Sequence, residues 1–298
     1  MVKAIFITGV SSGIGAAAVR LFADKGWNVV GTVRRTEDGT LWNDHKNVRI
    51  LKLDVTDAES VAGIADKAFA AFGRIDVVVN NAGYFQMGPL ETSTMEQIRA
   101  QYETNVFGLI GVTKAFLPRL RAQGSGLLIN VASISAENGY PFGSVYSSTK
   151  GAVATLTEAL NVELAAVGLN AKTILPGLHA TRIFTKIDIA PSVPEGYRPL
   201  LRQFIKMQQS VRGSEPEVVA KVIWTAVTDG RENRVRYYAG PDATYVPLAK
   251  RLMGAAGYWR FFRKTLLNGP DALTRLITPQ GRAKVEFGEN LYRMQNDG

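Results

Sequence analysis

The stretch Thr8-Gly9-Val10-Ser11-Ser12-Gly13-Ile14-Gly15 decides the fold of this 298-residue chain. It follows an apolar run over 4–7 that predicts a buried strand, and it precedes a run over 16–22 that predicts a helix. Glycines at such a junction let the backbone approach a ligand closely, and the first helical turn offers unpaired N–H groups and a positive dipole end. The stretch therefore predicts a phosphate-binding loop, to which Ser11 and Ser12 add hydroxyl donors.

Part of this loop, from Gly9 to Gly13, also matches the G-x-S-x-G nucleophile elbow of serine hydrolases. That fold takes part of its oxyanion hole from a loop that precedes the elbow, whereas only eight residues precede Gly9. His45 and His179 are the two histidines of the chain that could serve as the base. We therefore favour the phosphate loop and keep the serine hydrolase as an alternative.

Strand and helix patterns alternate along the chain. Further strands are predicted over 28–33, 48–53, 75–79, 126–131 and 170–175, and further helices over 58–72, 94–121 and 144–167. This alternation predicts an α/β fold of the Rossmann type, a doubly wound parallel sheet with helices on both faces. Ligands of such sheets bind beyond the carboxyl ends of the strands, so the residues that follow each strand are the functional candidates.

The composition excludes several classes of protein. The chain has no cysteine, which rules out disulfides and thiolate chemistry, and with two separated histidines we expect no metal site. No run of eighteen apolar residues occurs, so we expect no membrane span. A start on a strand, without a basic leader and apolar segment, favours a cytoplasmic location.

The net charge of +9 is unevenly distributed. Residues 1–179 hold 16 Lys and Arg against 15 Asp and Glu, whereas residues 180–298 hold 19 against 11. Basic residues alternate with aromatic ones over 258–264, a pattern that could contact nucleic acid or an anionic membrane surface. We favour a surface helix whose aromatic side chains pack inward, and we expect no nucleic acid partner. Peripheral contact of this basic tail with a membrane stays open.

The residues after the second and third strands point to the cofactor. Arg34 and Arg35 stand near the place where a fold for NAD usually carries an acidic residue, and arginine suits a 2′-phosphate instead, so we expect NADP. Solvated surface arginines are the alternative. Asp54 and Val55 follow the third strand, where Asp54 suits the exocyclic amine of an adenine or, alternatively, caps the following turn.

The fifth strand is followed by Ser133 and then by Tyr146 and Lys150, which lie four residues apart in a predicted helix and so on one face of it. A nearby ammonium favours the phenolate, so we expect Lys150 to lower the pKa of Tyr146 from about 10 toward a range useful for proton transfer. A Tyr/Lys pair at this spacing usually means a surface contact. Its place after a strand end favours catalysis.

Together these residues make the chain resemble the short-chain dehydrogenases/reductases from about residue 3 to residue 240. The resemblance implies a catalytic tetrad of Asn105, Ser133, Tyr146 and Lys150. It also implies that the cofactor is bound by the glycine-rich loop, by the segment that follows the fourth strand, by the Tyr/Lys pair and by the segment that follows the sixth strand. With the contacts argued above, the expected cofactor residues are Gly9, Ser11, Ser12, Gly13, Ile14, Gly15, Arg34, Arg35, Asp54, Val55, Asn81, Ala82, Gly83, Tyr146, Lys150, Pro176, Gly177 and Thr181.

The family's chemistry is the transfer of a hydride between a nicotinamide and a carbonyl or secondary alcohol, and we expect NADPH-dependent reduction. The resemblance gives Tyr146 the role of proton donor and Ser133 that of a hydrogen-bond donor to the carbonyl oxygen. Lys150 holds the nicotinamide ribose, and Asn105 holds a water that links Lys150 to solvent. A sensor that binds a dinucleotide without catalysis is the alternative from another class.

The last third of the chain resembles the branch of hydroxysteroid- and retinol-dehydrogenase-like members, which often take apolar carbonyl substrates. We expect one catalytic domain over 1–242, with a substrate lid at about 181–212, and a helical extension over 243–298. The candidate substrate contacts are Phe85, Gln86, Tyr140, Phe142 and Phe184. The resemblance also implies a homo-oligomer, a dimer that uses the helices at about 94–121 and 144–168.

Overall fold

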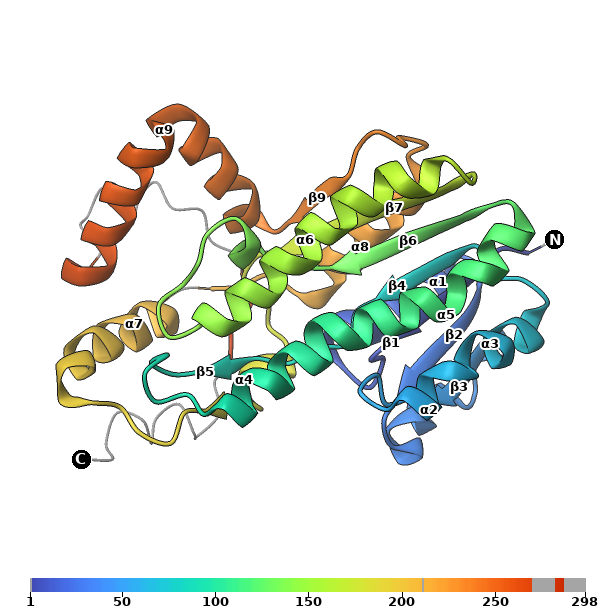
Figure 1. Ribbon diagram of the computed structural model, residues 1–298, viewed down its shortest axis with the longest axis horizontal. Coiled ribbons are helices and arrows are strands. Elements are labelled where there is room, and N and C mark those ends of the chain that lie inside the picture. Colours follow the sequence, from blue (N-terminus) through green and yellow to red (C-terminus); the bar gives the residue numbers. More distant parts are fainter. Residues whose placement is uncertain (1, 211, 270–281, 287–298) are drawn as a thin grey trace.

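The computed structural model describes residues 2–210, 212–269 and 282–286. Its centre is a sheet of seven parallel strands in the order β3-β2-β1-β4-β6-β7-β9 (Figure 1). The strands are β1 (Ala4–Thr8), β2 (Asn28–Val33), β3 (Val48–Lys52), β4 (Val77–Asn80), β6 (Gly126–Val131), β7 (Leu169–Pro176) and β9 (Arg236–Ala239). The predicted doubly wound α/β fold is confirmed.

Helices cover both faces of this sheet. One face packs against α1 (Gly13–Asp24) and α8 (Pro216–Thr228), and the other packs against α2 (Ala58–Ala62), α3 (Ile64–Phe72), α5 (Gly108–Gln123) and α6 (Ser144–Ala165). Side chains alternate along β1, so that Ile5 and Ile7 face α1 whereas Phe6 faces α3 and α5. Because both faces are buried, the strands are almost continuously apolar.

The strand order reverses between β1 and β4. The chain runs outward from β1 through β2 to β3, and it then crosses to the other side of β1 for β4, β6, β7 and β9. In an open parallel sheet the ligand crevice lies at such a switch point, beyond the carboxyl ends of the two strands. The loops after Thr8 and Asn80 therefore border the expected site.

Two predicted helices are interrupted. The segment 58–72 breaks at Gly63 into α2 and α3. The segment 94–121 comprises α4 (Met95–Tyr102), a π-helix over Glu103–Phe107, and α5. Apolar spacing continues through both interruptions, and for that reason the hydrophobic pattern does not show them.

The predicted lid at 181–212 is largely described, with residue 211 outside the described part. It consists of two 3-10 turns, η4 (Arg182–Phe184) and η5 (Glu195–Tyr197), a short strand β8 (Asp188–Ile189), and α7 (Arg198–Ser210). Strand β8 pairs in parallel with β5 (Gln86–Met87). This two-stranded sheet ties the lid to the loop that follows β4.

The extension predicted over 243–298 is described in two pieces, and residues 270–281 and 287–298 lie outside the described part. Its main element is α9 (Pro241–Asn268), which bends sharply at Gly254, where the φ angle is +68°. Residues 282–286 return to the base of the lid, where Ala283 and Gly213 exchange two backbone hydrogen bonds of 2.8 and 2.9 Å. Among the described residues, no helix is long and apolar enough to cross a membrane.

Candidate active site

The glycine-rich loop joins β1 directly to α1. Gly9 and Gly13 have φ angles of +73° and +58°, a region that other residues rarely adopt. A β-carbon at Gly15 would lie 2.3 Å from the carbonyl oxygen of Gly9, so the loop and the first turn of α1 touch backbone to backbone. The side chain of Ser12, the residue before α1, makes no capping hydrogen bond. The geometry therefore fits a phosphate group held by backbone N–H groups at the start of α1.

Thr8 and Asn81 fix the position of this loop at the switch point. The Thr8 hydroxyl accepts hydrogen bonds of 2.9 Å from the backbone N–H groups of Asn81 and Ala82. In return the Asn81 side-chain amide donates to the carbonyl oxygens of Thr8 and Gly9, at 2.9 and 3.1 Å. The side chain of Asn81, a predicted cofactor contact, thus shapes the loop itself.

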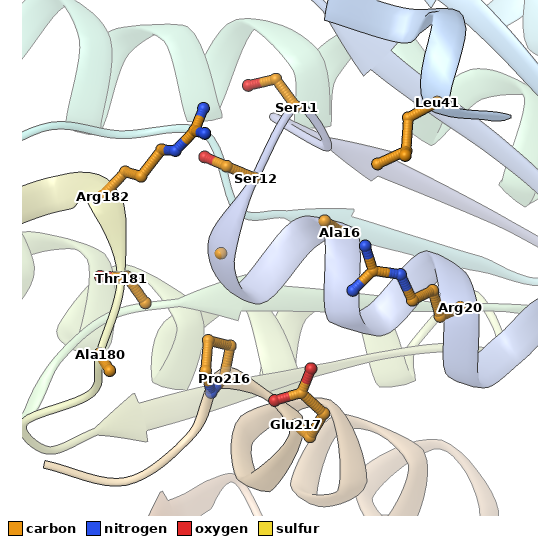
Figure 2. A pocket seen from close by; sticks show the side chains of 11 residues that line it. Ser11, Ser12, Ala16, Arg20, Leu41, Ala180, Thr181, Arg182, Pro216 and Glu217 are labelled. Atoms are coloured by element: carbon orange, nitrogen blue, oxygen red, sulfur yellow. The ribbon is translucent and has the colours of Figure 1, made fainter. Parts of the chain in front are cut away.

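A pocket of about 280 Å³ opens beside the loop (Figure 2). Its lining combines predicted cofactor residues with others that the sequence analysis missed. The predicted ones are Ser11, Ser12, Gly13 and Thr181, and the others are Ala16, Arg20, Leu41, Ala180, Arg182, Pro216 and Glu217. Figure 2 shows the Arg182 side chain pointing toward Ser12. Arg182 directly follows Thr181, so its place after β7 is a signal that could have identified it.

The two arginines after β2 differ in their surroundings. Arg35 makes a two-pronged ion pair with Asp38 in η1 (Thr36–Trp42), with both N–O distances at 3.1 Å, and both residues are solvent-accessible. Arg34 contributes to lowering the carboxyl pKa values of Asp38 and Asp54 through its charge. Arg35 is therefore already engaged by an acidic neighbour, which leaves Arg34 as the better candidate for an anionic ligand.

Asp54 adopts the turn-capping role that was one of its two predicted roles. Its Oδ1 accepts hydrogen bonds from the N–H and the hydroxyl of Thr56, at 3.0 and 2.7 Å. The bond from the backbone N–H is the main reason why its pKa is lowered. The carboxylate is thus ionised and held rigidly at the end of β3.

Ser133, Tyr146 and Lys150 come together beyond the carboxyl ends of β6 and β7. Ser133 follows β6 and caps the 3-10 turn η3 (Ile134–Ala136) by accepting the N–H of Ser135 at 3.1 Å. Tyr146 lies in the first turn of α6, and Lys150 follows one turn later. The Lys150 ammonium lies 5.7 Å from the centre of the Tyr146 ring and donates to the Val131 carbonyl at 2.9 Å.

Burial dominates the proton affinities of this pair. It raises the pKa of Tyr146 to about 12, against the opposing effect of a hydrogen bond with Ser133, and it lowers the pKa of Lys150 to about 8. The expectation that Lys150 lowers the pKa of Tyr146 is therefore wrong for this structure. The ammonium is directed at a backbone carbonyl, and desolvation of the phenol outweighs the hydrogen bond with Ser133.

Asn105 lies in the middle of the π-helix between α4 and α5 and is buried. Its side-chain amide donates to the carbonyl of Tyr84 at 3.0 Å and accepts the Tyr84 N–H at 3.1 Å, and it also donates to the Thr149 hydroxyl at 3.2 Å. A β-carbon at Gly83 would stand 3.0 Å from Asn105 Oδ1 and 3.6 Å from Lys150 Nζ. Asn105, Lys150 and Gly83 are thus close neighbours, and a side chain at Gly83 would press on Asn105.

An aromatic wall leads from Tyr146 to the lid. The Phe85 ring meets the Tyr146 ring edge-on at 4.7 Å, and Phe184 lies 6.2 Å from Phe85. Phe142 packs against Phe204 of α7 and has a φ angle of +61°, the one positive value among the non-glycine residues that the structure describes.

Two predicted substrate contacts face other partners. Gln86 is 1% exposed, its N–H donates to Gln101 at 2.7 Å, and its side-chain amide donates to Ser93 at 3.0 Å, so it braces β5 instead of facing a substrate. The Tyr140 ring packs 5.9 Å from Phe262 of α9. It links the loop before α6 to the extension.

Known proteins resemble this chain over most of its length. The family model described as short chain dehydrogenase matches residues 3–191. The uncharacterized oxidoreductase YusZ of Bacillus subtilis is 34% identical over 280 residues, which cover 89% of this chain and 99% of that protein.

Solved structures agree with this match. A short-chain dehydrogenase from Streptomyces avermitilis has a TM-score of 0.76 and 31% identity, over 89% of this chain and 99% of that one. A short chain dehydrogenase from Burkholderia cenocepacia in complex with NADP has a TM-score of 0.69 and 26% identity, over 89% and 97%. Sequence, fold and site therefore agree that the chain belongs to the short-chain dehydrogenase family of oxidoreductases.

Proposed function

We propose that the protein is an NADP(H)-dependent carbonyl reductase or alcohol dehydrogenase that acts on an apolar ketone or aldehyde. The observation that carries the proposal is the grouping of Ser133, Tyr146 and Lys150 at the switch-point end of the sheet. A phosphate-binding loop and an aromatic wall border this group. An NADP-bound relative with the same fold supports the choice of cofactor.

The residues of this chain fit a dinucleotide. Gly9, Gly13 and Gly15 let the loop turn tightly onto the start of α1, where backbone N–H groups suit a pyrophosphate, and Ser11 and Thr181 line the pocket beside it. Arg34 suits a 2′-phosphate at the end of β2, and Asp54 suits an adenine amine at the end of β3. When bound, the nicotinamide would supply the hydride that reduces a carbonyl carbon.

Tyr146 would supply the proton in reduction. Its high pKa keeps the phenol protonated at neutral pH, so it can donate to the alkoxide oxygen that develops on the substrate. Ser133, which shares a hydrogen bond with Tyr146, would orient the same oxygen. As Tyr146 transfers its proton, negative charge develops on the phenol oxygen. The nearby Lys150 ammonium would stabilise that charge and so make the proton transfer easier.

Lys150 would also hold the nicotinamide ribose, since its pKa of about 8 leaves it mostly charged at neutral pH. Asn105 would hold a water through which a proton reaches Lys150 from solvent. Gly83 lies next to both residues, which supports a short route for this proton. Oxidation of an alcohol runs through the same groups in reverse. A phosphorylated cofactor favours reduction.

The aromatic wall supports an apolar substrate. Phe85 borders the Tyr146 ring and Phe184 borders Phe85. Both pack against an apolar cluster that includes Met87, Ile187 and Phe204. Polar carbonyl compounds would lose hydration there without gaining partners. We expect kcat/KM to rise with the apolar surface of the ketone.

The test combines cofactor titration with one substitution. Nicotinamide fluorescence should report tighter binding of NADPH than of NADH, and the purified protein should then oxidise NADPH in the presence of apolar ketones. Tyr146→Phe should keep NADPH affinity within about twofold and lower kcat by about a hundredfold or more, as expected when a general acid is lost. Turnover of Tyr146→Phe at the wild-type rate would refute the proposed proton donor. Cofactor binding by a wild type that reduces no carbonyl compound would instead favour the sensor.

We also propose that the protein works as a homodimer through α5 and α6. Phe107, the last residue of the π-helix before α5, is 55% exposed, and Val162 of α6 is 74% exposed, although both are large apolar residues. These helices correspond to the dimer faces implied by the resemblance. Light scattering should give twice the monomer mass for the wild type and a lower mass for Val162→Glu.

A further inference from the structure

Helix α9 forms an arch that stands away from the body of the molecule. Figure 1 shows it leaving the end of β9, bending at its apex and returning toward α7. The bend is at Gly254, and every residue of the apex, 251–256, is exposed. An apex of sequence Arg-Leu-Met-Gly-Ala-Ala is unusually apolar for a surface projection.

The inward face of α9 is accounted for by packing within the protein. Before the bend, Ala243, Val246 and Ala249 are buried at helical spacing against the turn that follows Ser133. After the bend, Tyr258 and Leu266 are buried, the latter in the apolar cluster of the lid. The aromatic residues Tyr258 and Phe262 thus pack inward, as the sequence predicts.

The outward face presents large apolar side chains to solvent. Of the fourteen large apolar residues that are exposed in the described part of the chain, five lie on α9. They are Leu248 (54% exposed), Leu252 (76%), Met253 (43%), Trp259 (44%) and Leu267 (53%). Leu252, at the apex, has the highest exposure of all fourteen. Trp259 also packs against Phe262, with ring centres 5.5 Å apart, and only part of it reaches solvent. The hydrophobic core of the described residues does not include Leu248, Leu252, Met253 or Leu267.

The charges on this helix have a single sign after its first turn. Residues 243–269 contain five Lys and Arg and no Asp or Glu. Of the five, Lys250 is half-buried and donates to the Glu137 carbonyl, whereas Arg251, Arg260, Arg263 and Lys264 are exposed. Arg260, Arg263 and Lys264 share a surface groove with Trp259, Leu267 and Asn268. Cations therefore lie beside Trp259 and Leu267, and Arg251 precedes Leu252 at the apex.

We propose that the apex and outward face of α9 bind the surface of an anionic lipid bilayer. Leu252 and Met253 would enter the boundary between headgroups and acyl chains, and Trp259 would lie at headgroup level. Arg260 and Arg263 would pair with lipid phosphates, which their planar guanidinium groups suit. This surface goes beyond the proposed catalytic function and uses none of its residues.

Two other partners fit this surface less well. A second copy of the chain would bring four exposed cations against four others, and like charges across an interface are costly. Nucleic acid would satisfy the cations, but it would leave Leu248, Leu252 and Met253 in water. An anionic bilayer satisfies both the charges and the apolar side chains.

The arch also connects this surface to the lid. Leu266 packs in one cluster with Leu201 and Phe204 of α7, and Phe262 lies against Tyr140. Docking through α9 would therefore hold the substrate side of the molecule near the bilayer, where apolar ketones concentrate. This last step rests on the proposed function, whereas the docking itself does not.

The experiment measures co-sedimentation of the full chain with vesicles of phosphatidylcholine alone and of equimolar phosphatidylcholine and phosphatidylglycerol. The wild type should sediment with the anionic vesicles only, and less so as salt rises. Leu252→Glu combined with Met253→Glu should lower the partition coefficient at least tenfold. Arg260→Gln combined with Arg263→Gln should lower it roughly twenty-five-fold, since each cation near an anionic surface contributes about fivefold. All variants should keep the circular dichroism and NADPH affinity of the wild type.

Matched controls lie on other parts of the surface. Val2→Glu places a charge on an exposed apolar residue, and Lys52→Gln combined with Lys67→Gln removes two exposed cations. Both should bind vesicles like the wild type. A wild type that stays in solution with anionic vesicles, or controls that lose binding as the α9 variants do, would overturn the proposal.

Two further outcomes would assign the face to another partner. A lower mass of Leu252→Glu in light scattering, without vesicle binding by the wild type, would assign it to a second copy. A DNA gel shift that requires Arg260 and Arg263, again without vesicle binding, would assign it to nucleic acid. Because NADPH binding is measured separately, failure of the docking proposal remains distinct from failure of the proposed function.

Discussion

Asp242 occupies the space that a side chain at Gly177 would need. A β-carbon at Gly177 would lie 2.1 Å from Asp242 Oδ1, and Asp242 Oδ2 accepts the N–H of Leu178 at 2.6 Å. The start of α9 is thereby joined to the segment after β7 that leads to Thr181 and the phosphate-loop pocket. The extension thus supports the cofactor side of the molecule.

Asp242→Ala should therefore weaken both folding and cofactor binding. It leaves the partly buried N–H of Leu178 without its acceptor, which costs about 1 kcal/mol of the free energy of unfolding. Urea denaturation and NADPH titration measure the two effects. Asp242→Asn keeps an oxygen that can accept the same bond and should restore most of both. NADPH affinity unchanged in Asp242→Ala would show that the segment holds its shape without α9.

The pH dependence of reduction should carry the signature of Lys150. Burial lowers the pKa of its ammonium to about 8, so the charge is present below that pH and is lost above it. NADPH affinity and kcat/KM for reduction should therefore fall as pH rises through about 8. Tyr146, with a pKa of about 12, remains protonated over this range and adds no second limb.

Lys150→Arg separates this explanation from others. A guanidinium stays charged throughout, so any residual NADPH affinity of the variant should not change between neutral pH and pH about 9. If NADPH affinity of the variant still fell as pH rose through about 8, a group other than Lys150 would be responsible for that fall.

Asp38 should reduce the preference for NADPH. It holds Arg35 in an ion pair and adds a negative charge where a 2′-phosphate would lie. Asp38→Asn should tighten NADPH binding several-fold and leave NADH binding nearly unchanged. Arg34→Gln should weaken NADPH binding about tenfold or more, the usual effect of losing a charge-assisted hydrogen bond. Asp44→Asn, which removes an exposed acid later in the same loop, is the matched control. If these substitutions changed the affinities for NADH and NADPH equally, a contact between Arg34 and the 2′-phosphate would be excluded.

Acid stability should depend on Asp229. Its burial raises the carboxyl pKa, but hydrogen bonds from the Arg231 N–H, the Tyr237 hydroxyl and Lys172 outweigh this effect and lower the pKa to about 2 from an ordinary 3.8. The unfolded chain then binds more protons between these values, so stability present above pH 3.8 is lost as pH falls toward 2. Asp229→Asn should unfold more easily at neutral pH and lose less stability on acidification. If the free energy of unfolding of the wild type and of Asp229→Asn fell in parallel as pH was lowered, the prediction would be wrong.

Sequence pattern was sufficient for features that depend on local spacing. The loop glycines between β1 and α1 predict the fold, because strand ends of a parallel sheet meet at one edge. The four-residue spacing of Tyr146 and Lys150 predicts that the two side chains lie close together, as they do. Gln86 failed as a prediction because its partners, Gln101 and Ser93, become its neighbours only when α4 packs on β5. The raised pKa of Tyr146 depends on its burial, to which the Phe85 ring contributes, and spacing along the sequence does not reveal that burial.

The π-helix over Glu103–Phe107 sets the rotational phase of the helical segment that contains Asn105. An α-helix turns about 100° per residue, and one wider turn holds an extra residue without lengthening the helix by a full step. With this extra residue Asn105 points to Tyr84 and Thr149, while Val112, Phe116 and Leu120 of α5 still face the core. Deleting a single residue of the π-helix would rotate either Asn105 away from its partners or the core side chains of α5 away from the sheet. Such a deletion variant would therefore lose either the packing of the core or the position of Asn105, and it could not keep both.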